Sequence, residues 1–115
     1  MGHQPEKVIE ASILREFATR NDMRLWKNPV GNAITPDGAQ RVRFGLIGQA
    51  DLTGILPDGR RLEIEVKTEI GQQRPAQVNY EKMITRFHGL YILARSVDDV
   101  YRALEINGYQ FRRTA

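Results

Sequence analysis

Two strand-like runs joined by Pro-Asp-Gly constrain the fold more than any other part of this chain. Residues 48–67 read GQADLTGILPDGRRLEIEVK. A two-residue turn at Asp-Gly would place Asp51 and Glu65 on opposite faces of the hairpin. A three-residue loop over 57–59 instead gives Pro and Gly the positions that a type I turn followed by a bulge favours. This second register sets Asp51 directly opposite Glu65.

The three-residue loop sorts the hairpin into two faces. The apolar face carries Ala50, Leu52, Leu62, Ile64 and Val66, and the polar face carries Asp51, Thr53, Glu63, Glu65 and Lys67. Opposed strand residues have Cβ atoms about 4.5–5.5 Å apart, so two opposed carboxylates repel unless one is protonated or a cation lies between them. A divalent metal removes this repulsion, and an ordinary solvated face is the alternative. Glu63 either supports the metal ligands from behind or is solvated, and we favour solvation.

A third acid lies on the apolar stripe of a predicted first helix, over Pro5 to Asn21. Apolar residues recur there at helical spacing, at Ile9, Ile13, Leu14 and Phe17. Glu10 shares the face of the last three, and a carboxylate on such a stripe needs a partner. That partner is either a lysine or arginine at the edge of the stripe or a metal shared with the hairpin. The hairpin acids favour the metal.

The rest of the chain alternates helices and strands. We predict a strand over Met23–Val30, a loop over Gly31–Gln40, a short strand over Arg41–Phe44, a helix from Pro75 to about Phe87, a buried strand over Leu90–Ala94, and a helix capped by Ser96 that runs to about Ile106. Tyr80, Met83, Ile84 and Phe87 form an apolar stripe that predicts burial, with a dimer contact as a possible extension. The order αβ(β)ββαβα defines an α/β protein.

Composition narrows the class of protein. The 115 residues fit one compact domain, so we expect a single domain over 1–115. A net charge of +3 is compatible with a polyanionic partner. The absence of cysteine excludes disulfides, thiolate zinc sites and cysteine nucleophiles. No apolar run reaches membrane-spanning length, so we expect a cytoplasmic protein with no membrane partner.

Together these residues resemble the virus-type replication-repair nuclease (VRR-NUC) domain of the PD-(D/E)XK nuclease superfamily. The resemblance spans about Glu6 to Leu104 and rests on Glu10 in a first helix, Gly48 and Asp51 opening a strand, Glu65-Val66-Lys67 closing its partner, and Gln77 in the next helix. It departs at Ala50, where the superfamily's name places proline. The resemblance implies a restriction-endonuclease-like core, a mixed β-sheet flanked by helices, and hydrolysis of DNA phosphodiesters with Mg²⁺ or Mn²⁺. It also implies a homodimer that acts on branched DNA such as four-way junctions.

The resemblance assigns roles to individual residues. Asp51 and Glu65 would hold the metal, Glu10 would complete that site or bind a second ion, and the carbonyl of Val66 would add a ligand. Lys67 would orient the attacking water or stabilise developing charge, and Gln77 would orient Lys67 or the water.

Basic residues beside this candidate site are the predicted DNA contacts, namely Arg41, Arg43 and Arg74. Gly48 either lets a phosphate backbone approach or serves only a tight bend. Two other classes of function stay open. One is a non-catalytic nucleic-acid-binding module, and the other is a structural subunit that contributes only an interaction surface.

Overall fold

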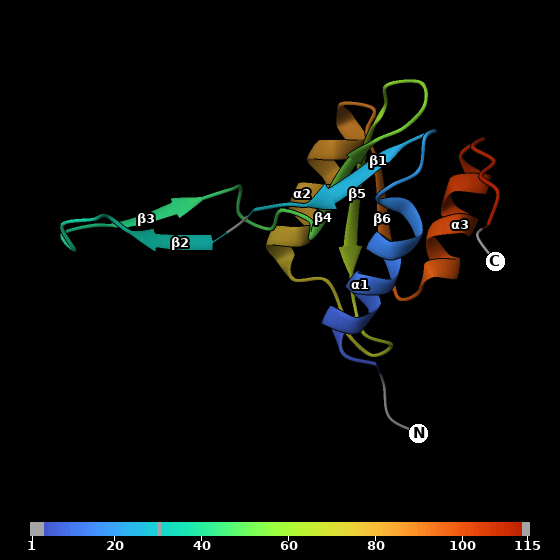
Figure 1. Ribbon diagram of the computed structural model, residues 1–115. Coiled ribbons are helices and arrows are strands. Elements are labelled where there is room, and N and C mark those ends of the chain that lie inside the picture. The colour runs from blue at the N-terminus through green and yellow to red at the C-terminus, as the bar shows by residue number, and fades with distance from the viewer. Residues whose placement is uncertain (1–3, 30, 114–115) are drawn as a thin grey trace.

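The computed structural model describes residues 4–29 and 31–113, which form three helices, a mixed four-stranded sheet and a separate two-stranded sheet (Figure 1). The elements are α1 (Glu6–Phe17), β1 (Arg24–Lys27), β2 (Gly31–Ile34), β3 (Arg41–Phe44), β4 (Leu52–Ile55), β5 (Arg61–Val66), α2 (Pro75–Arg86), β6 (Leu90–Ala94) and α3 (Val97–Ile106). The larger sheet has the order β1-β4-β5-β6, in which only the β5–β6 pair is parallel. The predicted α/β class and mixed sheet are confirmed.

The β4–β5 hairpin has the predicted three-residue loop. Leu56 N–H donates to the carbonyl of Arg60 at 2.9 Å, and Gly59 takes the left-handed φ of 88° that the bulge position requires. The ladder pairs Thr53 with Glu63, so the register is the predicted one, and the two-residue turn is wrong. Continuing this register places Asp51 opposite Glu65.

Helices cover both faces of the sheet. One face packs on α1 and α3 around the main core, which includes Ile13, Phe17, Leu62, Ile64 and Tyr101. The other face lies under α2, where Tyr80 and Ile84 pack against Ala50. Ala50 therefore does not share a face with Leu52 as predicted, because it precedes β4 and strand alternation does not extend to it.

The expectation that Glu63 is solvated is wrong. Both faces of β5 are buried, and Glu63 is fully inaccessible to solvent. The hairpin alone would expose its polar face, but α2 packs over it and brings Tyr80 against Glu63. The burial of this acid is therefore a consequence of tertiary packing.

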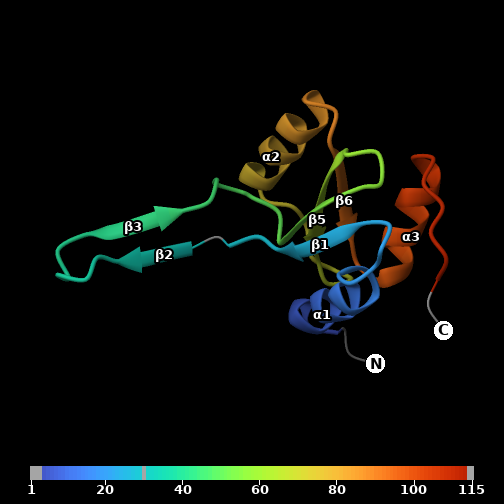
Figure 2. The same ribbon diagram turned by 45° about the horizontal axis from the view of Figure 1, so that its top comes forward.

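The segment Gly31–Gln40, predicted as a loop, instead begins with a strand. β2 pairs with β3 in antiparallel register, and the turn between them is closed by a hydrogen bond from Thr35 N–H to the carbonyl of Gln40 at 2.8 Å. This pair of strands, which we call the arm, extends away from the rest of the molecule (Figures 1 and 2). The end of the preceding predicted strand, at Val30, lies outside the described residues.

The helix ends follow local signals with one difference. Pro75 opens α2, and the Ser96 hydroxyl accepts a hydrogen bond from Asp99 N–H at 3.2 Å at the start of α3, as predicted. The first helix ends at Phe17, four residues before the predicted Asn21. Among the described helices, none combines the length and apolar character needed to cross a bilayer.

Candidate active site

Asp51 and Glu65 lie together at the end of the β4–β5 hairpin that is opposite its turn. Asp51 accepts a hydrogen bond from Val66 N–H at 2.7 Å, which ties the carboxylate to the end of β5. Burial raises the pKa of Asp51, and the charges of Glu10 and Glu6 raise it further. The hairpin register thus places two acids side by side in a partly desolvated setting.

Of the two carboxylates, Glu65 has the more strongly raised pKa. Its side chain is almost fully buried, and burial followed by the charge of Asp51 raises its pKa from 4.5 to about 7. One oxygen, Oε2, accepts a hydrogen bond from Gln77 at 2.8 Å and lies 3.7 Å from Lys67 Nζ. The other oxygen, Oε1, is buried and has no hydrogen-bond partner. A buried oxygen of this kind needs a proton or a cation.

Gln77 positions Glu65, which differs from the predicted contact with Lys67 or a water. Its side-chain carbonyl accepts from Arg74 N–H at 2.8 Å and so caps α2, while its amide nitrogen donates to Glu65. One side chain therefore couples the start of α2 to the acid. Lys67 is buried beside the same acid, where its charge lowers the pKa of Glu65.

Glu10 approaches the two acids but is held by another residue. Its carboxylate makes an ion pair with Lys27 at 3.3 Å, which is the basic partner that the sequence left open as the alternative. Its charge still reaches Asp51, whose pKa it raises. Within residues 4–29 and 31–113, no three acidic or histidine side chains converge on one metal position. The structure thus brings Asp51 and Glu65 together and leaves Glu10 at the edge.

A buried network around Glu63 supports the site, and none of its hydrogen bonds was predicted from the sequence. Glu63 accepts hydrogen bonds from the Thr53 and Tyr80 hydroxyls, from Asn28 at 3.3 Å and from Arg61 at 3.0 Å. These partners come from the end of β1, from β4, β5 and α2. The pKa of Tyr80 is raised by burial and by Glu63. The signal in the sequence was the spacing of two residues between Glu63 and Glu65, which places both on one face, and in the structure α2 contacts both.

The predicted DNA contacts are dispersed. Arg41 is exposed on the arm, and Arg43 lies on the same strand with a side chain outside the described part of the structure. Arg74 is exposed at the start of α2, close to the acids through Gln77. Gly48 has a φ of 77°, and a Cβ there would lie 2.2 Å from the carbonyl oxygen of Ala76. Its close approach is thus to the chain's own helix, which supports the tight-bend interpretation.

A divalent cation fits the chemistry of this donor set. Glu65 Oε1 is a buried carboxylate oxygen without a partner, and both acids have raised pKa values that a positive charge would lower. Mg²⁺ prefers oxygen ligands and commonly uses one or two protein carboxylates while it keeps several waters. Asp51 and Glu65 would supply those carboxylates, and the main-chain carbonyl of Val66 is the additional ligand that the resemblance implies.

Metal binding should therefore stabilise the fold in a pH-dependent way. Because folding raises the pKa of Glu65 from 4.5 to about 7, metal-free stability should fall as the pH rises from about 4.5 to about 7. Millimolar Mg²⁺ or Mn²⁺ should raise the melting temperature at about pH 8, and much less at about pH 5 where protons compete. Thermal melts at both pH values test this. Asp51→Asn should abolish the rise, and an equal rise in that variant would contradict the assignment.

No protein-family model, curated protein or solved structure matches this chain.

Proposed function

We propose that this chain is a divalent-metal-dependent DNA nuclease with a restriction-endonuclease-like core. The observation that carries the proposal is the buried Glu65 carboxylate, which has one unpartnered oxygen and lies beside Asp51 and Lys67. Acids with strongly shifted pKa values beside a specific positively charged side chain are typical of catalytic centres. The VRR-NUC resemblance of the same residues supports this assignment.

Each residue of the site has a defined task under this proposal. A bound Mg²⁺ or Mn²⁺ would supply Lewis acidity and lower the pKa of a water. Asp51 and Glu65 hold the cation, and Gln77 is a positioning residue that fixes Glu65. Lys67 provides a positive charge where the attacking water is oriented and negative charge develops on the phosphate. Glu10 joins the site, or binds a second ion, when it leaves Lys27.

Branched DNA is the proposed substrate, and a homodimer is the proposed assembly. A four-way junction presents pairs of symmetry-related strands, so paired incision by a domain with one centre calls for a two-fold dimer. Of the predicted DNA contacts, Arg74 lies close to the acids, because its N–H bonds Gln77 and Gln77 bonds Glu65. The arm carries Arg41 away from the body, where a long substrate would reach it (Figure 2).

A cleavage panel tests the proposal. Linear, flapped and four-way DNA should be incubated with Mg²⁺, with Mn²⁺ and with EDTA. We expect phosphodiester cleavage of branched substrates with either metal and none with EDTA.

The Glu10–Lys27 ion pair favours the second candidate, a non-catalytic nucleic-acid-binding module, because it satisfies Glu10 without a metal. Metal-independent binding with no cleavage of any substrate would support that module and reject the nuclease.

A further inference from the structure

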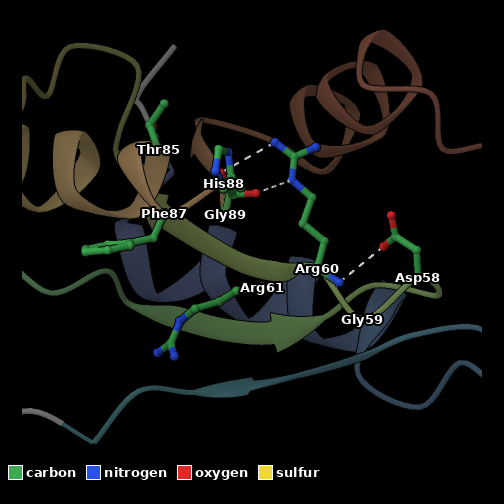
Figure 3. Close-up of a pocket in the computed structure, with 8 residues that line it drawn as sticks. All are labelled: Asp58, Gly59, Arg60, Arg61, Thr85, Phe87, His88 and Gly89. Carbon is green, nitrogen blue, oxygen red and sulfur yellow. Dashed lines mark hydrogen bonds between the residues drawn. The ribbon is translucent and has the colours of Figure 1, made fainter.

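A second candidate site lies at the opposite end of the sheet from Glu65. It is an open groove of about 790 Å³ between the β4–β5 turn, the end of α2 and the start of β6 (Figure 3). β5 begins at this groove with Arg61 and ends at the candidate active site, and α2 runs between the same two places. We call this feature the distal groove and define it by Arg60, Arg61, Phe87 and His88.

Fixed positive charge characterises the distal groove. The Arg60 side chain donates to the main-chain carbonyls of His88 at 2.7 Å and Gly89 at 3.5 Å, so the described bonds that hold its guanidinium involve no carboxylate. Arg61 bonds the buried Glu63 through Nε, yet 57% of its side chain remains exposed. The acid at the groove, Asp58, accepts hydrogen bonds from the Tyr109 hydroxyl and from Arg60 N–H. A preorganised guanidinium of this kind suits a phosphate.

An exposed aromatic ring lies across the groove from Arg60. Phe87 was predicted to belong to the buried stripe of α2, but 67% of it is exposed. The guanidinium of Arg86 lies over its ring at 5.0 Å. Figure 3 shows Phe87 and Arg61 extending to one side, while Arg60 turns back towards His88 and Gly89. Exposed aromatic rings flanked by arginine are platforms on which unpaired bases stack.

His88 occupies a backbone position that favours glycine. It lies two residues after Arg86, the last residue of α2, and its φ of 71° makes it the one left-handed non-glycine residue in the described part of the chain. Hydrogen bonds from His88 N–H to Thr85 and from Gly89 N–H to Ile84 complete a Schellman motif, whose left-handed position is usually glycine. A left-handed non-glycine residue whose side chain is exposed at the edge of a groove is therefore a position to test for function.

We propose that the distal groove binds one nucleotide of single-stranded DNA, with its phosphate on Arg60 and His88 and its base against Phe87. The inference rests on the proposed function for the identity of the polyanion. α2 has 12 residues and so separates the two sites by about 18 Å. Lys82 and Arg86 are exposed along this helix and provide a basic path between the sites. The groove would hold the unpaired strand of a branched substrate while the acids act on its junction.

Binding measured without cleavage tests the proposal. The anisotropy of labelled single-stranded and duplex DNA should be followed in EDTA for the wild type, Phe87→Ala and His88→Gly. Arg15→Ala, which removes an exposed charge from α1, is the matched control. Both groove variants should bind single strands about fivefold or more weakly and duplex nearly as well as the wild type. His88→Gly should also melt at a higher temperature, because glycine relieves the left-handed strain.

The outcomes separate this inference from the nuclease proposal. Unchanged single-strand affinity in both groove variants would overturn the distal groove even if metal-dependent cleavage persists. If the wild type never cleaves DNA, but both groove variants bind single strands more weakly than the wild type does, the nuclease proposal is rejected and the distal groove is retained. If inorganic phosphate competes equally well against the wild type and Phe87→Ala, the site binds phosphate alone and base recognition is wrong. A dimer that Phe87→Ala converts to monomer in sedimentation would make the groove a contact between two copies and overturn the proposal.

Discussion

Replacing Lys67 with alanine is expected to lower the single-turnover rate of DNA cleavage by about two orders of magnitude or more, while DNA affinity stays within a few-fold of wild type. Lys67 is buried with its Nζ 3.7 Å from Glu65 Oε2, so it has little access to the flanking phosphates that set affinity. Under the proposed mechanism, its charge instead lies where negative charge would develop during phosphodiester hydrolysis. Rates at saturating DNA and binding constants in EDTA measure the two effects separately.

Two further variants sharpen this test. Glu65→Gln keeps the shape of the side chain but loses the charge that would hold the metal, so it should reduce the rate as Lys67→Ala does. Arg15→Ala removes a positive charge, as Lys67→Ala does, but from an exposed position on α1 outside the proposed DNA contacts, and its rate at saturating DNA should match the wild type. If Lys67→Ala cuts as fast as the wild type, the assignment of the site to Asp51, Glu65 and Lys67 fails.

The pairing of Asp51 with Glu65 was predictable because the signals that determine it are local. Proline and glycine in the loop over 57–59 select a three-residue turn, and strand alternation then fixes every facing pair. Gly59 does adopt the left-handed conformation, and Thr53 does pair with Glu63. The starts of α2 and α3 followed equally local capping signals.

The burial of Glu63 was not predictable in the same way, since it depends on which element covers the hairpin. The alternation of side chains along the strand predicts that Glu63 shares a face with Glu65, but it does not predict that Tyr80 packs on that face. Phe87 follows Arg86, the last residue of α2, and is exposed, whereas the apolar stripe predicted it as a buried helix residue. The Glu10–Lys27 ion pair joins two elements whose relative placement the sequence pattern leaves open.

The second strand of the arm, Arg41–Phe44, was predicted, but the first strand was missed, for a different reason. β2 is only four residues long and begins with Gly-Asn, which are depleted in strands, so no pattern distinguished it from a loop. Its pairing with β3 supplies the hydrogen bonds that its own sequence does not predict. Consequently Arg41 lies on the arm away from the acids, although it is close to them in the sequence.

Replacing Glu63 with alanine is expected to lower the free energy of unfolding by about 3–5 kcal/mol, a large part of the total for a domain of this size. The substitution removes a fully buried carboxylate and leaves Asn28, Thr53, Tyr80 and Arg61 without their shared acceptor. Buried donors that lose an acceptor keep their desolvation cost, so the loss exceeds that of a single hydrogen bond. Urea unfolding followed by circular dichroism measures the change.

Two matched substitutions separate this network from a general effect of losing an acid. Glu105→Ala removes an exposed carboxylate from α3 and should change stability by less than about 0.5 kcal/mol. Glu63→Gln keeps an acceptor for Asn28 and Tyr80 but presents an amide to Arg61 or Thr53, so its loss should be intermediate. Since the network ties α2 to β4 and β5, and α2 positions Glu65 through Gln77, Glu63→Gln should also weaken the stabilisation by Mn²⁺. A Glu63→Ala variant as stable as Glu105→Ala would show that water satisfies these donors and that the network does not hold α2 in place.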